Sequence, residues 1–118
     1  MRIDAAMWVG VLIMAKRATE PFDSADAVGR FVLGQALVTL RRDPRAAVRH
    51  LTWAIEHRPP VTTDGEHYWP PAVRWRLGQA YAELGVADSA RSSFREALRL
   101  QPGFHSVLVS LDSLNRAR

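Results

Sequence analysis

The sequence predicts an all-α protein of about six helices that pack as antiparallel pairs. Three observations support this fold class. One segment of the chain recurs further along it, apolar residues in both copies follow helical spacing, and proline and glycine stand where helices would begin and end. With 118 residues, 47% of them hydrophobic and 24% charged, the chain has the size and composition of one folded domain. We therefore expect a single domain over residues 1–118.

The first predicted element is an N-terminal helix over residues 4–18. Residues 5–15 form an apolar stretch of 11 residues, preceded by Asp4 and followed by Lys16 and Arg17. A membrane-spanning helix needs about 20 apolar residues. The acidic residue at Asp4 and the lack of a clean cleavage motif do not fit a secretory signal peptide. We expect this helix to pack on the domain of a cytoplasmic protein; export or membrane anchoring through the helix is the alternative.

An internal repeat covers residues 25–59 and 70–102. Its first part is Leu33-Gly34-Gln35-Ala36-Leu37, which recurs as Leu77-Gly78-Gln79-Ala80-Tyr81. Five downstream positions keep the same spacing in both copies: Ala47, Leu51, Ala54, Ile55 and Pro59 match Ala90, Phe94, Ala97, Leu98 and Pro102. This pattern predicts two amphipathic helices in each copy, facing one another.

Residues that favour helix ends stand between these segments. Asp43 before Pro44 combines an N-cap with proline at the first helical position. Gly85 is able to take the left-handed conformation that ends a helix. Gly34 and Gly78 lie inside the first helix of each copy, where we expect them to admit a closely packed neighbour despite a helix-propensity cost of about 1 kcal/mol.

The two copies resemble the tetratricopeptide repeat. The second copy carries the family's leucine–glycine pair, the alanines and aromatics that follow it, and the closing proline, whereas the first has Leu37 and Leu51 where aromatics are common. The resemblance covers a little over half of the chain. It implies an α-solenoid of antiparallel helix pairs, whose first helices line a concave groove that binds a peptide or protein segment.

The chain departs from the family between the copies and beyond them. The family's repeat has 34 residues, whereas Pro59 to Pro102 spans 43, so an inserted loop over 60–69 is expected. Long loops in compact helical arrays are often functional. Apolar residues at helical spacing then predict a C-terminal capping helix over 103–116. The N-terminal helix, or a second copy of the chain, would cover the other end.

The resemblance also implies where a partner binds. The expected groove residues are Phe31, Gln35, Val38 and Thr39 in the first copy, Trp75, Gln79 and Glu83 in the second, and Tyr68 and Trp69 in the loop. Packing of Phe31 and Trp75 between helices is the alternative. Family members that hold a terminal carboxylate use a lysine and asparagines near the places of Phe31, Gln35 and Gln79, so such a clamp is not implied.

Motifs of common enzyme and cofactor sites are absent from the sequence. There is no cysteine, no phosphate-binding or dinucleotide motif, no zinc-protease motif and no nucleophile elbow. His50 and His57 share a predicted helix, but zinc requires three or four ligands. We expect a protein without catalysis, cofactor or metal.

The basic residues do not favour nucleic acid as the partner. The net charge is +4, and nucleic-acid binding would need interleaved aromatics or a basic groove. The arginines that cluster around the first copy's turn and second helix are interrupted by Asp43 and Glu56. These arginines are Arg41, Arg42, Arg45, Arg49 and Arg58. We expect a scaffold or adaptor that binds a protein or peptide. The alternative is a homodimer or a membrane-associated assembly module that uses the apolar N-terminal helix.

Overall fold

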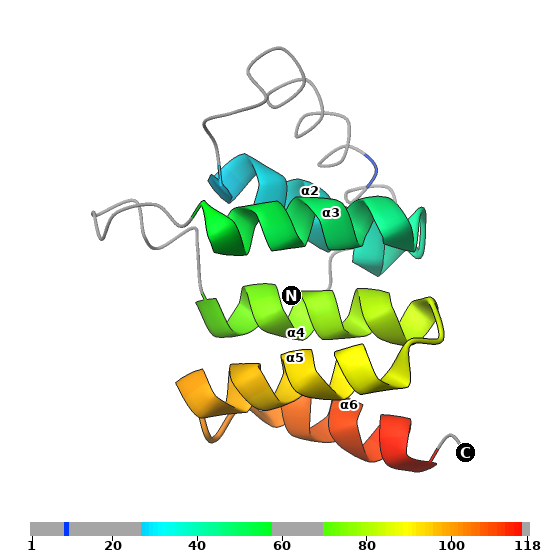
Figure 1. Ribbon diagram of the computed structural model, residues 1–118, viewed down its shortest axis with the longest axis vertical. Helices are drawn as coiled ribbons and strands as arrows, with labels where there is room; N and C mark the ends of the chain where they lie inside the picture. Colours follow the sequence, from blue (N-terminus) through cyan, green and yellow to red (C-terminus); the bar gives the residue numbers. More distant parts are fainter. Residues whose placement is uncertain (1–8, 10–26, 58–69, 117–118) are drawn as a thin grey trace.

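The computed structural model describes residue 9 and residues 27–57 and 70–116, and the regular structure in these ranges is entirely helical (Figure 1). This confirms the predicted all-α class. Within 27–57 and 70–116, five helices follow one another: α2 (Ala27–Leu40), α3 (Pro44–Glu56), α4 (Pro70–Glu83), α5 (Ala87–Leu100) and α6 (His105–Arg116). The helix expected over 4–18 and the loop expected over 60–69 lie outside the described residues, apart from Val9.

Successive helices lie side by side (Figure 1). The most extensive contacts join α2 to α3 and α4 to α5, and α3 packs on α4 to connect these two pairs. In addition to its sequence neighbours α3 and α5, α4 contacts both α2 and α6. The first helix of each pair and the C-terminal helix therefore share one side of the array.

Two apolar clusters form the core. The larger is shared by α2, α3 and α4 and includes the fully buried Leu33, Leu51 and Val73. The smaller joins α5 to α6 around Phe94. Tyr81 of α4 packs against both clusters, so α4 links the two halves of the core.

The second helix of each pair buries the apolar stripe that its sequence predicts. Alanines lie where the helices come close, and one larger residue fills the space between them. The buried residues are Ala47, Leu51 and Ala54 on α3, and Ala90, Phe94 and Ala97 on α5. The periodicity of the sequence was thus sufficient to identify these faces.

Gly34 and Gly78 lie where the two helices of each pair come closest. A Cβ atom at position 34 would lie 2.6 Å from Leu51 Cγ, and one at position 78 would lie 2.5 Å from Phe94 Cδ1. Leu51 and Phe94 are equivalent positions of the sequence repeat. Each copy therefore closes its helix pair with the same contact, and the prediction that these glycines admit a close neighbour is confirmed.

The turns that close the two helix pairs begin alike but use different residues. After α2, Arg42 N–H donates to Leu37 O at 3.0 Å and Arg41 takes a φ of 53°. After α4, Val86 N–H donates to Tyr81 O at 3.0 Å and Gly85 takes a φ of 78°. Both are helix ends with one left-handed residue, which confirms the role expected of Gly85. The first copy has arginine where the second has glycine.

Asp43 caps α3, as its place before Pro44 predicts. Its Oδ1 accepts a hydrogen bond from Ala46 N–H at 3.1 Å, and its own φ is 44°, in the left-handed region. Loss of an N-cap side chain costs about 0.5–2 kcal/mol, and alanine tolerates left-handed backbone less well than asparagine does. We expect Asp43→Ala to lower the free energy of unfolding by about 1–2 kcal/mol in urea denaturation followed by circular dichroism. Asp43→Asn, which keeps the acceptor, should stay close to wild type; equal losses in both variants would contradict this role.

Candidate functional site

A groove of about 510 Å³ crosses the side of the array that α2, α4 and α6 share. Residues from all three of these helices line it, and Phe94 of α5 contributes to its wall. The lining residues are Val38, Arg41, Gln79, Ala82, Glu83, Phe94, Val109, Ser110, Ser113 and Leu114. The groove is therefore built by four segments of the chain, and most of its lining comes from three of them that are distant in sequence.

The groove combines an apolar surface with a few polar groups. Val109 is 51% exposed, which leaves an apolar side chain open to a ligand. The amide of Gln79, the carboxylate of Glu83 and the guanidinium of Arg41 supply hydrogen-bonding groups and charges of both signs. Mixed apolar and polar linings of this kind suit an extended or helical segment of another protein.

Three of the predicted site residues border this groove: Gln79, Glu83 and Val38. Val38 also belongs to the core and is only 7% exposed, so Gln79 and Glu83 offer more surface to a ligand. Phe31 is buried in the core between the helices, with 7% of its surface exposed, and so offers little area to a ligand. Gln35 is half-buried, and the Thr39 hydroxyl donates to the Gln35 carbonyl at 2.9 Å; these two residues are not among those lining the groove.

Tyr68 and Trp69, the two site residues predicted in the loop, lie outside the described residues. Trp75 is described, and it packs between α4 and α6. Its ring centroid lies 5.6 Å from that of Phe104, and its Nε1–H donates to Ser110 Oγ at 3.0 Å. Trp75 thus positions Ser110 in the groove wall, and its replacement by alanine would disturb packing as well as any binding.

Arg76 was not among the predicted site residues, although it stands beside Trp75. Its guanidinium carbon lies 4.2 Å from the centroid of the Trp75 ring, and Nη1 donates to Gln79 Oε1 at 3.1 Å. The side chain is half-buried, and Nε is buried without a hydrogen-bond partner. Burial lowers the pKa of Arg76 to about 10.

The α6 contribution was also missed, because helical spacing at 103–116 indicated only a capping helix. The contact between α4 and α6 places Val109, Ser110 and Ser113 on the groove. Arg41 could have been found from the sequence, since alignment of the two copies sets it opposite Gly85. An arginine at a position that favours glycine is a detectable signal.

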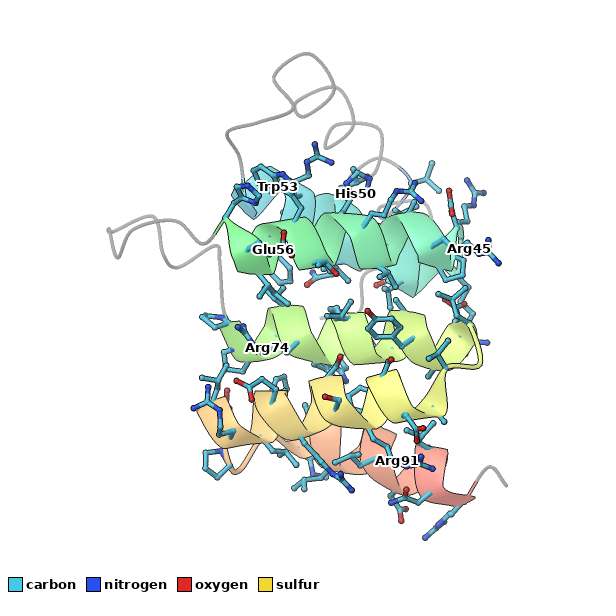
Figure 2. The ribbon with its side chains drawn as sticks, viewed as in Figure 1. Arg45, His50, Trp53, Glu56, Arg74 and Arg91 are labelled. Atoms are coloured by element: carbon cyan, nitrogen blue, oxygen red, sulfur yellow. The ribbon has the colours of Figure 1, made fainter. Side chains whose placement is uncertain are left out.

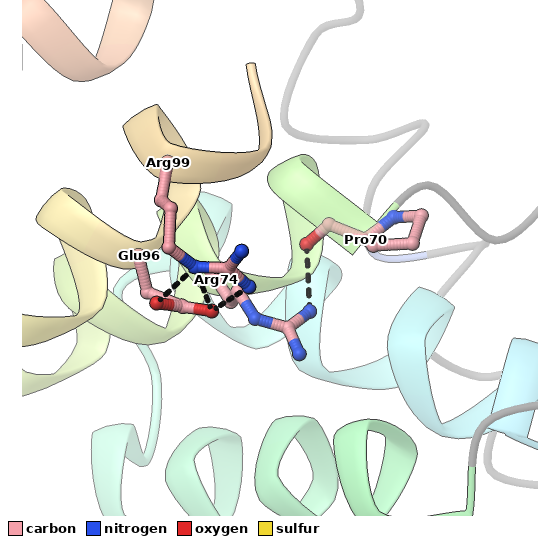
Figure 3. Close-up of polar contacts among 4 residues, drawn as sticks. All are labelled: Pro70, Arg74, Glu96 and Arg99. Atoms are coloured by element: carbon pink, nitrogen blue, oxygen red, sulfur yellow. Dashed lines mark hydrogen bonds and ion pairs between the residues drawn. The ribbon is translucent and has the colours of Figure 1, made fainter. Parts of the chain in front are cut away.

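A second hollow, of about 460 Å³, lies along the outer face of α5. Its charges largely pair within the helix. Arg99 Nε lies 3.0 Å from both carboxylate oxygens of Glu96 (Figure 3). Arg91 Nη1 lies 3.3 Å from Asp88 Oδ1. The hydrogen bond from Arg99 holds the pKa of Glu96 below its usual value. Arg74, from α4, donates to the Pro70 carbonyl at 3.1 Å. A single helix with paired charges offers less to a ligand than the groove does.

His50 lies on α3, at the edge that faces away from α4 (Figure 2), and His57 is the residue that follows α3. A hydrogen bond of 2.7 Å links Arg30 Nη1 to His50 Nδ1, and the ring of His57 stacks on Trp53 at 3.9 Å. The Arg30 guanidinium also lies 5.1 Å from the Trp53 ring, which ties α2 to α3. Within residues 27–57 and 70–116, groups of three or more metal-ligating side chains are absent.

None of the helices in the described ranges combines the length and the apolar character that crossing a membrane requires. Comparisons with protein-family models, with curated proteins and with solved structures find no match to this chain.

Proposed function

We propose that this chain is a non-catalytic, cytoplasmic interaction module of the tetratricopeptide-repeat type, an α-solenoid that binds a peptide or protein segment between α2, α4 and α6. The groove carries this proposal. Residues from all three helices converge on it, and its lining includes both the exposed Val109 and the amide of Gln79. An apolar anchor next to hydrogen-bonding groups is what binding a side chain and a backbone of another protein requires.

The equivalent packing of the two sequence copies supports a repeat architecture. Glycine on the first helix contacts a large residue on the second in both pairs, as Gly34 does Leu51 and Gly78 does Phe94. In addition, α6 follows α5 in the way that α4 follows α3, and it contributes to the groove as a third first helix. Stacked repeats of this type are expected to line one continuous surface.

Selection of random peptides displayed on phage against the purified protein tests the proposal. Selected peptides are synthesised with a fluorescent label, and their affinities are measured by fluorescence polarisation. Val109→Asp places a charge on the apolar part of the groove and is expected to weaken binding by about tenfold or more. Gln79→Ala should weaken it as well, since it removes the amide.

Leu108→Asp is the matched control. Leu108 is the neighbour of Val109 on α6 and has a similar exposure, 47% against 51%, but it does not line the groove. Binding should survive Leu108→Asp. If both aspartate variants keep full affinity while circular dichroism shows them folded, peptides do not bind in this groove.

Homo-oligomerisation is a second candidate, favoured by the exposure of Leu108 and Leu100 at the C-terminal end of the array. Exposed leucines on the last two helices of a stack are suited to a contact between copies. Light scattering of the wild type and of Leu108→Asp tests it: a dimer that becomes a monomer in the variant would support this candidate, and a monomeric wild type would exclude it.

A further inference from the structure

We infer that the groove selects an acidic segment of a partner protein, whose carboxylate side chains pair with Arg41 and Arg76. This inference rests on the proposed function and names the chemistry of its ligand. The inference is based on two arginines. In the free protein, Arg41 has a left-handed backbone and Arg76 has a buried Nε without a hydrogen-bond partner, and both conditions are unfavourable for an arginine.

The first observation is the backbone at Arg41. This residue has a φ of 53° at the end of α2, in the place that Gly85 has at the end of α4. The left-handed conformation disfavours every residue with a Cβ atom relative to glycine. The side chain of Arg41 lines the groove, which a glycine would leave bare. A disfavoured residue on a binding surface indicates that its side chain is needed there.

The second observation is the burial of Arg76. The side chain is half-buried on the Trp75 ring, and its Nε lacks a hydrogen-bond partner. Charged groups that are buried are normally paired with an opposite charge. Arg91, Arg99 and Arg116, by contrast, each lie within 3.3 Å of a carboxylate oxygen on their own helix. Arg76 is not itself a lining residue of the groove, but its Nη1 donates to the neutral amide of Gln79, which is. The guanidinium therefore keeps further Nη–H groups that an anion bound beside Gln79 can accept from.

The placement of the two arginines defines a spacing. Arg76 lies next to the groove, where it donates a hydrogen bond to the lining residue Gln79. Glu83 lies seven residues after Arg76 on α4, which corresponds to about 10 Å along the helix axis. Arg41 lies at the Glu83 end, because it follows α2 as Gly85 follows α4. An extended chain advances about 3.3 Å per residue. Two carboxylates about three residues apart would therefore reach both arginines.

A carboxylate suits this groove better than a phosphate. The carboxylate of Glu83 lies in the same groove, and it repels a phosphate dianion more strongly than a carboxylate monoanion. Hydrogen bonds from a guanidinium to a carboxylate are among the stronger ones in proteins. An aspartate or glutamate pair beside an apolar residue that contacts Val109 is the expected ligand.

The test uses labelled peptides of the form Asp-x-x-Asp with a neighbouring leucine, amidated at the C-terminus so that only side-chain carboxylates remain. Fluorescence polarisation should show that the matched Asn-x-x-Asn peptide binds about 10- to 100-fold more weakly. Arg76→Gln should weaken the Asp peptide by a similar factor and leave the Asn peptide unchanged.

Arg41→Gly is a second test, because it should change stability and peptide affinity in opposite directions. It should raise the melting temperature by a few degrees, since glycine accepts the left-handed backbone, and weaken the Asp peptide by about 3- to 10-fold. Arg41→Gln removes the charge but keeps a Cβ atom, and it should also weaken the Asp peptide by about 3- to 10-fold. Arg42→Gln is the charge-matched control for Arg41→Gln, because Arg42 is exposed and does not line the groove. Arg42→Gln should leave the affinity unchanged.

The outcomes separate the inference from the proposed function. Equal affinities for the Asp and Asn peptides would overturn the inference while peptide binding in the groove stands. Equal weakening by Arg41→Gln and Arg42→Gln would reduce the effect to net charge and overturn it too. A phosphoserine peptide that binds more than about tenfold tighter than its Asp counterpart would overturn the choice of carboxylate. If no peptide binds, the proposed function fails with the inference.

Discussion

Phe94→Ala is expected to lower the free energy of unfolding by about 3–5 kcal/mol, the largest effect of any substitution considered for this protein. The Phe94 side chain is 2% exposed, lies at the centre of the α4–α5 contact and belongs to the cluster that joins α5 to α6. Its truncation leaves a cavity that the surrounding helices fill only in part. Because single domains are stable by about 5–15 kcal/mol, such a loss brings the protein close to unfolding at room temperature.

Urea denaturation followed by circular dichroism measures this effect. Leu108→Ala serves as the control, since Leu108 is 47% exposed and should change the free energy of unfolding by less than about 0.5 kcal/mol. A comparable loss in the two variants would show that Phe94 does not organise the core. Phe94 also contributes to the groove wall, so peptide affinity should fall with stability in Phe94→Ala.

Gly78→Ala is expected to destabilise the protein by about 1–3 kcal/mol, although alanine favours helix over glycine by about 1 kcal/mol. The added Cβ would lie 2.5 Å from Phe94 Cδ1, and the buried ring has little room to move. The α4 and α5 helices must therefore separate. The melting temperature from thermal unfolding checks this sign, which is opposite to the one that helix propensity alone predicts.

Two other glycines are matched controls for Gly78→Ala. Gly103→Ala meets no atom within 4 Å and should be neutral or slightly stabilising. Gly85→Ala also meets open space, but its φ of 78° should cost about 1 kcal/mol through backbone strain. Destabilisation by all three variants to the same degree would contradict a steric role for Gly78.

A double-mutant cycle tests whether the destabilisation by Gly78→Ala arises at the contact between Gly78 and Phe94. Phe94→Leu replaces the ring with the side chain that faces Gly34 in the first copy. If the Cβ at position 78 acts by displacing Phe94, Gly78→Ala should be less destabilising in the Phe94→Leu background by about 0.5–3 kcal/mol. Additive effects would place the cause elsewhere in α4.

The sequence by itself determined the helical class, the positions of α3 and α5 and the faces they bury. Alternation of Ala47, Leu51 and Ala54 at helical spacing is a local pattern, and so are the Asp43–Pro44 cap and the left-handed Gly85. Local patterns are set by hydrogen bonding and side-chain volume within one or two turns, which a sequence displays directly.

Only the tertiary structure decided which residues of the first helices line the groove. Phe31 and Trp75 pack between helices, Gln79 and Glu83 line the groove, and α6 supplies Val109. The burial of Arg76 was equally invisible in the sequence, because it depends on the Trp75 ring and on neighbouring helices. A single residue turns a side chain by about 100° around a helix axis. The rotation of each helix is therefore chosen by how all of them pack together, and this packing separates core residues from groove residues.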